Sequence, residues 1–472
     1  MDRWDRLAVP LSLSLSGATL LSLVGGRYRI DALRCSSWPS LQTNLWAAAL
    51  FLLAVSLLSV GWLRLLRLCQ REAGPSARQI VCAGMVLYFV AGMGPPALSD
   101  DPLFYAALGR AQAEYQASPY QPLCQIMPAD DALLQRLIPH WRCGRSPYQA
   151  GFHVLASGLA WASRGSLVML LRCFQAVAGL SLLAAGGLTA LALRGSTLRP
   201  AYGAALVVFN PLSVIEGPAS AHNDALLALS CAGFVLAWQR GQRGGVLLAH
   251  GAGLLVKVSS LLLSGLLFAA LALRRLAPQL DRVRQRRGFR GLLVLSAALA
   301  LLGLGGWLFY ARPEALFGPS HLPWEHCTRS IECLPRSILR SILHRPREAL
   351  FVGVASRLLA GIWLGYVAWR ASQQPHGLLR WLGAGLLIYY LYLHPWSQSW
   401  YLLSLLPLAP WLGLRMSRAL RVVSISACAY YAAVLVGNCL EDELAIAAFD
   451  LVEALIVLVP PTVSLLRQRQ DG

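Results

Sequence analysis

Residues 80–105, IVCAGMVLYFVAGMGPPALSDDPLFY, decide the interpretation of this chain. The segment from Ile80 to Leu98 carries no charge, and its length suits a membrane crossing. It ends on Asp100 and Asp101, which places two carboxylates at the membrane–water boundary, where an ionised group is tolerated. Acids held there can take a proton from a water-borne acceptor while a lipid-borne donor lies alongside. The stretch therefore predicts an integral-membrane enzyme.

The composition extends this prediction to the whole chain. Of its 472 residues 56% are hydrophobic and only 13% charged, whereas soluble domains carry about 25% charged residues. Apolar stretches long enough to span a bilayer recur throughout, and the first (residues 7–24) lacks a cleavage pattern and is expected to be a span rather than a signal peptide. The fold class predicted is all-α, a polytopic membrane protein of about 14 transmembrane helices.

The net charge of +19 does not predict a nucleic-acid partner, because the arginines gather in short segments between the apolar stretches. This is the positive-inside pattern, and it places both termini in the cytoplasm. The basic segments are residues 64–78, 194–199, 240–243, 274–290, 370–380, 415–421 and 467–469.

Three parts are expected from this topology. Residues 1–79 form an N-terminal pair of transmembrane helices. Residues 80–311 form a catalytic transmembrane module whose long outer loop, residues 99–165, contains juxtamembrane helices. Residues 312–472 form a C-terminal transmembrane module with an outer loop over residues 312–348.

The cysteines indicate an oxidising outer face. Cys124 and Cys143 fall in the first outer loop and Cys327 and Cys333 in the second, so either pair could form a disulfide. No cysteine or histidine spacing suggests a structural metal. Nucleotide-binding motifs are also missing from the sequence, and no cofactor is expected.

Four polar clusters fall on the outer face under this topology. The first contains Asp100 and Asp101, followed by Tyr105 and Arg110. A carboxylate at this position can act as general base on an acceptor hydroxyl. The alternative is a solvated loop after a helix.

The second cluster contains Glu216, His222, Asn223 and Asp224. A plain helix N-terminus explains Asn223 or Asp224, since an acid in the first turn favours the helix dipole. It does not explain Glu216 and His222 in the same membrane-embedded turn. Ionisable groups at membrane depth are costly and indicate function.

The third cluster contains Lys257, at the tip of a predicted helical hairpin. A lone lysine in an apolar sequence either extends to the interface or binds an anion such as phosphate. Arg172, early in the span after the outer loop, presents the same two alternatives.

The fourth cluster contains His394, Gln398, Trp400 and Tyr401. An interfacial aromatic belt alone would account for the aromatic residues. On one face with a base and cations, however, these groups suit a hydroxyl attacking a sugar carbon whose leaving group is a lipid phosphate.

At these residues the chain resembles the GT-C class of integral-membrane glycosyltransferases, and especially bacterial polyprenol-phosphate-mannose-dependent α-mannosyltransferases. The motifs that carry the resemblance are Asp101…Tyr105, Gly109-Arg110, Pro119-Tyr120, Asn210-Pro211…Glu216…His222-Asn223-Asp224, Lys257-Val258-Ser259 and His394-Pro395…Trp400-Tyr401. Two departures are Ser118 in place of the family's usual asparagine, and two helices that precede the usual family start.

The resemblance implies a metal-independent, inverting transfer of a sugar, mannose above all, from a polyprenyl-phosphate donor to a glycan, glycolipid or protein acceptor. The enzyme would lie among the lipids of a bacterial inner membrane, with its site facing the periplasm. Asp101 would be the base, with Asp100 as an additional acid. The donor phosphate would contact Lys257, Arg172 and His394. The substrate would contact Tyr105, Arg110, Glu216, His222, Asn223, Asp224, Gln398, Trp400 and Tyr401.

The alternative is a transporter or flippase, for which Arg357 inside a span is the best residue. Transporters bind substrate near the midplane, often within internal repeats, and no repeat is evident here. A non-catalytic scaffold would leave the one-sided polar clusters unexplained. The enzyme interpretation predicts that Asp101, Lys257 and His394 line one outward-facing cavity.

Overall fold

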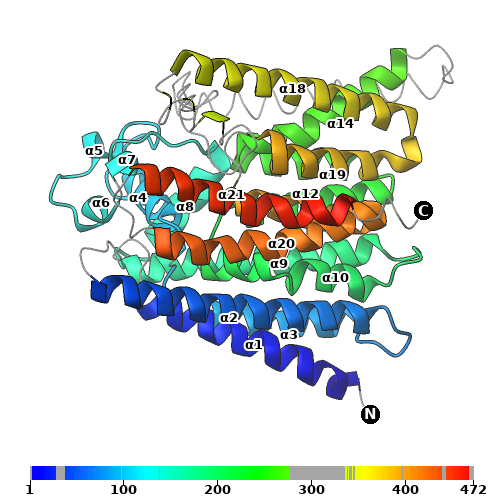
Figure 1. Cartoon of the computed structure of the whole chain (residues 1–472), viewed down its shortest axis with the longest axis horizontal. Coiled ribbons are helices and arrows are strands. Elements are labelled where there is room, and N and C mark those ends of the chain that lie inside the picture. The colour runs from blue at the N-terminus through cyan, green and yellow to red at the C-terminus, as the bar shows by residue number, and fades with distance from the viewer. Residues whose placement is uncertain are drawn as a thin grey trace.

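The computed structural model describes residues 3–27, 38–96, 98–137, 139–276, 346–394, 398–437 and 443–466, with a few positions between 335 and 343. Every named element within these ranges is helical, and one isolated antiparallel bridge joins Tyr148 to Lys257. The long helices lie side by side in a bundle, and a group of short helices, α4 to α8, covers one end (Figure 1). The all-α prediction is confirmed.

The bundle contains the helices α1 (Arg3–Arg27), α2 (Trp38–Cys69), α3 (Ala77–Ala91), α9 (Leu167–Ala192), α10 (Pro200–Val208), α11 (Pro211–Val214), η2 (Ile215–Ala219), α12 (Asp224–Gln239), α13 (Arg243–Val256), η3 (Val258–Ser260), α14 (Leu261–Leu276), α18 (Pro346–Gln373), η5 (Pro375–Gly377), α19 (Leu378–Ile388), η6 (Tyr389–Leu393), η7 (Ser399–Trp411), α20 (Gly413–Gly437) and α21 (Glu443–Leu466). The end group contains α4 (Asp101–Ala113), α5 (Leu123–Ile126), α6 (Ala132–Arg136), α7 (Pro139–Arg142) and α8 (Ala150–Ala162).

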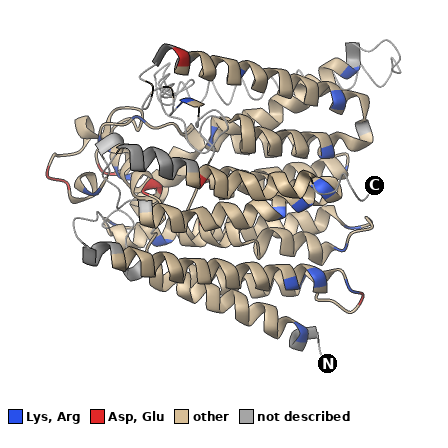
Figure 2. Cartoon of the chain, viewed as in Figure 1, with Lys and Arg blue, Asp and Glu red and all other residues tan. Residues whose placement is uncertain are grey.

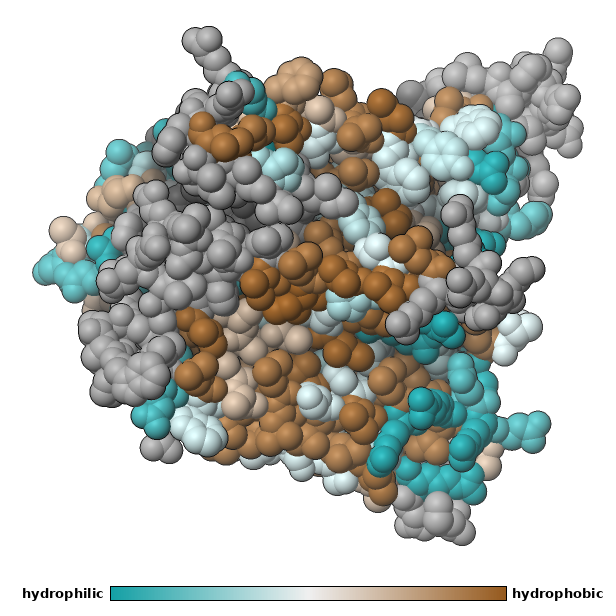
Figure 3. Space-filling view, in the orientation of Figure 1, coloured by the Kyte–Doolittle hydropathy of each residue, from teal (hydrophilic) through white to brown (hydrophobic). Residues whose placement is uncertain are grey.

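Five of the described helices are long and apolar enough to cross a membrane, and several shorter apolar helices accompany them. The five segments are Arg6–Gly25, Gln42–Cys69, Leu167–Ala192, Phe351–Gln373 and Gly413–Val436. Apolar side chains also cover much of the visible outer surface of the bundle (Figure 3). An extensive apolar exterior is typical of a protein that faces lipid. The predicted count of 14 helices includes residues 277–334, which lie outside the described ranges.

The charged residues are distributed unevenly along the bundle. Most of the described Lys and Arg residues gather at the end where α1 begins (Figure 2). The short helices α4 to α8 lie at the opposite end (Figure 1). The described parts of the basic segments therefore lie mostly at one end of the molecule, whereas residues 277–290 and 467–469 lie outside the described ranges.

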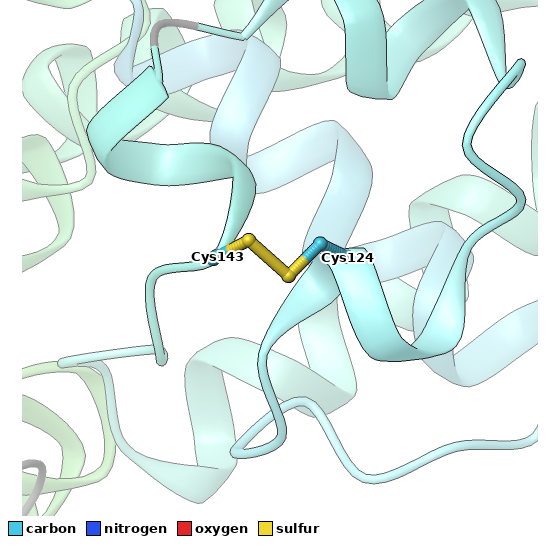
Figure 4. The surroundings of a disulfide bond; sticks show 2 residues. All are labelled: Cys124 and Cys143. Atoms are coloured by element: carbon cyan, nitrogen blue, oxygen red, sulfur yellow. A yellow bond between two sulfur atoms is a disulfide. The ribbon is translucent and has the colours of Figure 1, made fainter.

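The end group has its own hydrophobic core and a covalent link. Helix α4 packs on α8 at Gly109, where an added Cβ would lie 2.5 Å from the carbonyl oxygen of Ala156. Cys124 and Cys143 form a disulfide (Figure 4), so the first of the two possible pairs is bridged. Cys327 and Cys333 lie outside the described residues.

Candidate active site

An irregular backbone brings the second cluster together. The Asn210 Oδ1 atom accepts from the backbone N–H of Leu212 at 2.9 Å and caps α11, and the π-helical turn η2 follows directly. Ala221 then adopts φ 57°, a left-handed conformation that is uncommon outside glycine. Through this sharp turn the backbone N–H of His222 reaches the carbonyl oxygen of Glu216 at 2.9 Å. Strained backbone of this kind clusters at functional sites.

The imidazole of His222 lies between two carboxylates. Its Nδ1 atom is 3.5 Å from Asp101 Oδ2, and its Nε2 atom is 3.3 Å from Glu216 Oε2. The indole of Trp400 stacks on the ring, with centroids 4.1 Å apart and planes at 16°. The side chain of His222 is fully buried. The first, second and fourth clusters therefore meet at this histidine.

Asp101 is the first residue of α4 and keeps 13% of its side chain exposed. The Tyr105 hydroxyl, one turn later, donates to its Oδ2 atom at 3.1 Å. Burial by itself raises the pKa of this carboxyl, but the hydrogen bond and charge of His222 and the charge of Lys257 lower it below its ordinary value. The group is therefore ionised at neutral pH and can accept a proton.

Glu216 has a partner from the far end of the chain. The Tyr431 hydroxyl on α20 lies 3.0 Å and 3.2 Å from the two carboxylate oxygens, and Ser399 Oγ lies 3.1 Å from that hydroxyl. The sequence analysis did not find Tyr431 or Ser399. The only sequence signal was a pair of tyrosines at 430 and 431, within an apolar stretch in the second half of the helix.

Lys257 stands where the helical hydrogen-bond ladder is interrupted between α13 and η3, with φ −155° and ψ 136°. Its Nζ atom donates to Asp224 Oδ2 at 2.8 Å and lies 4.6 Å from the centroid of the Tyr401 ring. Asp224 is the first residue of α12 and is 1% exposed. The ammonium therefore joins the third cluster to the second and the fourth.

The remaining residues of the fourth cluster lie beside this ammonium. The ring of His394 packs against that of Tyr401, with centroids 5.2 Å apart. Gln398 is buried and directly precedes η7. Asn223, between His222 and Asp224, is 4% exposed, and neither atom of its amide has a hydrogen-bond partner among the described residues.

Two arginines that were predicted to contact the substrate or the donor phosphate, Arg110 and Arg172, have partners within the protein. Arg110 forms ion pairs with Glu114 at 2.8 Å and Asp131 at 3.2 Å. Arg172 donates to the backbone carbonyl oxygens of residues 92–94 and so holds the turn after α3. These contacts fix the two loops that flank α4. Asp100 precedes α4 and makes no capping hydrogen bond with its side chain.

Within the described ranges, no group of three or more His, Cys, Asp or Glu residues is placed to hold a metal ion. The site is instead built from buried carboxylates, an imidazole, an ammonium and aromatic rings.

Residues 13–275 match the MptA_B family, described as alpha-(1->6)-mannopyranosyltransferase, N-terminal domain. This segment is more than half of the chain and contains Asp101, His222 and Lys257. The chain belongs to the MptA_B family. Its name indicates mannosyltransferase activity and supports a membrane glycosyltransferase of the GT-C type. Neither a curated protein nor a solved structure matches the chain.

The family match corrects one expectation. The two helices before residue 80 were expected to precede the family's usual start, but the matched MptA_B region begins at residue 13, inside α1. The matched region therefore covers α2 and the part of α1 from residue 13 onward.

Proposed function

We propose that this protein transfers a mannosyl group from a polyprenyl-phosphate donor to an acceptor hydroxyl on the extracytoplasmic side of the membrane, with inversion at the sugar carbon. The observation that carries the proposal is that Asp101, His222 and Lys257 lie together in one cluster. Most of the described arginines lie at the other end of the bundle from α4, the helix that begins with Asp101. A base and a cation in one place are what an attack on a lipid-phosphate sugar requires.

The reaction forms one bond and breaks another. The acceptor oxygen attacks the anomeric carbon while Asp101 removes the hydroxyl proton. The bond between that carbon and the phosphate oxygen breaks, and its electron pair leaves with the polyprenyl phosphate. Lys257 stabilises the charge that develops on the departing phosphate. Because the family name specifies an α-linked product, an inverting step requires a β-linked donor.

His222 and Glu216 would act as a support for the base. The imidazole bridges Asp101 to Glu216, whose other partner is the Tyr431 hydroxyl. This series of contacts orients the Asp101 carboxylate. We expect His222 to be a positioning residue, because its ring is fully buried while Asp101 retains exposed surface.

Two observations support the proposed side of the membrane. The arginines gather at one end of the bundle, and such residues favour the cytoplasmic side of a bacterial inner membrane. The disulfide lies in the end group that covers the other end, and disulfides persist in oxidising compartments. Both favour a site that faces the periplasm.

A donor panel tests the proposal. Purified protein in detergent is incubated with one acceptor and with polyprenyl-phosphate mannose, polyprenyl-phosphate glucose or a nucleoside diphosphate mannose, and products are identified by mass spectrometry. We expect mannose transfer from the polyprenyl donor, with inversion, and none with Asp101→Asn. Transfer from the nucleotide donor alone would refute the assigned donor. Equal transfer by the Asp101→Asn protein would refute the assigned base.

A further inference from the structure

A basic groove lies at the end of the bundle where α1 begins. It encloses about 530 Å³ between α1 and α2. Arg6 and Val9 contribute from α1, and Arg64, Arg67 and Leu68 contribute from α2, with Arg71 just beyond its end. Hydrophilic residues gather on this corner of the surface beside a large apolar area (Figure 3).

The arginines of the groove are available to bind a ligand. Arg64 and Arg67 are three residues apart on α2, which places their side chains on one face of the helix. Arg71, just beyond the helix end, lines the same groove, and all three are exposed. Among the described residues the guanidinium groups of these three arginines have no hydrogen bond or ion pair. Arg6, by contrast, donates to the carbonyl oxygen of Ala73 at 2.8 Å, which fixes one wall.

A further guanidinium lies behind the groove. An added Cβ at Gly74, a lining residue, would lie 3.2 Å from Arg199 Nη1. That atom is buried and has no hydrogen-bond partner in the described part of the chain. Leaving a buried donor without a partner is unfavourable. An anion in the groove would reduce this electrostatic cost.

The remaining lining identifies the kind of anion. Val9 and Leu68 make part of the groove apolar. Val9 is 53% exposed, and Val60, one turn before Arg64, is 43% exposed, so the apolar surface continues up the outside of the bundle. A free phosphate would use only the arginines, whereas a phospholipid also has acyl chains to lay along these residues.

We infer that the groove between α1 and α2 binds the phosphate headgroup of an anionic bilayer phospholipid, with its acyl chains along the apolar outer face of these helices. Basic pockets between transmembrane helices are a recurrent way of holding such headgroups. The groove lies at the opposite end of the bundle from the end group, which contains α4 and its first residue Asp101 (Figure 1), so it is independent of the proposed sugar transfer.

Native mass spectrometry of the purified full chain tests the inference, with phosphatidylglycerol titrated in detergent. We expect the triple variant Arg64→Gln, Arg67→Gln, Arg71→Gln to bind this lipid on the order of a hundredfold more weakly, since each arginine near a lipid surface contributes about a factor of five. The matched control replaces Arg415, Arg418 and Arg421 of α20 by Gln. It removes the same charge from the basic segment of another helix and should change binding by less than threefold.

Two further arms separate the possible ligands. A large excess of inorganic phosphate should not displace the lipid, and Val9→Trp, which keeps every charge and fills part of the apolar wall, should weaken binding severalfold. Equal losses in the two triple variants would overturn the inference, because general charge attraction would then explain binding. Full displacement by inorganic phosphate, or unchanged binding in both the α2 triple variant and Val9→Trp, would also overturn it.

Discussion

Replacing Asp101 by Asn removes the proposed base with the smallest change of shape. Asn keeps an acceptor for the Tyr105 hydroxyl, which donates to Asp101 Oδ2 at 3.1 Å, but it cannot take a proton. General-base catalysis contributes about a factor of 10² to 10⁴. At 1.36 kcal/mol for each factor of ten, this is about 3–5 kcal/mol of transition-state stabilisation. We therefore expect transfer to slow at least a hundredfold while donor binding persists.

Two neighbouring variants set the scale of this effect. Tyr105→Phe deletes one hydrogen bond to the carboxylate but keeps the base. A hydrogen bond to a charged group contributes about 1.5–3 kcal/mol, and this one contributes to both ground state and transition state, so the rate should fall less than with Asp101→Asn. Asp100→Asn changes the adjacent acid, which makes no capping hydrogen bond, and should keep most activity.

The assay is single-turnover transfer from polyprenyl-phosphate mannose, with product quantified by mass spectrometry. Donor affinity and thermal unfolding are measured on the same preparations, so that a misfolded variant is recognised. A rate for Asp101→Asn within tenfold of the natural protein would refute Asp101 as the base. A comparable loss in Asp100→Asn alone would move that role to its neighbour.

Three further predictions concern other parts of the molecule. Lys257→Ala should weaken donor binding at least tenfold. It should also lower the thermal unfolding midpoint, because it leaves the buried Asp224 carboxylate unpaired. Unchanged donor affinity and transfer rate would indicate that the lysine only extends to the membrane interface. Gly109→Ala forces a Cβ to 2.5 Å from a backbone oxygen and should destabilise the protein by about 1–3 kcal/mol in thermal unfolding, whereas Gly158→Ala, with no atom within 4 Å, should not. Burial raises the pKa of Asp131, but the hydrogen bonds from the backbone N–H groups that it caps and the charge of Arg110 lower the pKa overall. The ionised carboxylate therefore stabilises the folded protein fully above its ordinary pKa of about 4, and this stabilisation is lost as the pH falls through the lowered pKa of the folded state. Asp131→Ala should therefore cost about 1 kcal/mol at pH 7, and its unfolding midpoint should approach that of the natural protein as pH is lowered to 3; a difference independent of pH would contradict this.

Local chemistry in the sequence was enough to find the central groups of the candidate site. A residue before a proline favours the end of a helix, and α10 ends at Val208, two residues before Asn210. Asp224 was predicted in the first turn of a helix and is the first residue of α12. An ionisable residue in apolar sequence is costly wherever it lies, so Glu216 and Lys257 stand out without any structure.

Partners across long sequence distances could not be predicted. Tyr431 lies 215 residues from Glu216, and no local pattern encodes that pairing. Nor does a sequence show what a guanidinium will bind. Arg172 was a candidate for phosphate, and its partners are backbone carbonyl oxygens.

The element η7 has a consequence for how the chain crosses the bilayer. It is a 3₁₀ helix of 13 residues, Ser399–Trp411, with Pro407 and Pro410 inside it, and such helices seldom exceed four residues. At about 2.0 Å of rise per residue it extends roughly 26 Å, against about 20 Å for an α-helix of the same length. Thirteen residues thus come close to the hydrocarbon thickness of about 30 Å, and rewinding them into an α-helix would retract the tryptophan that covers His222 by about one turn. A 3₁₀ segment of this kind covers more bilayer depth per residue than an α-helix does.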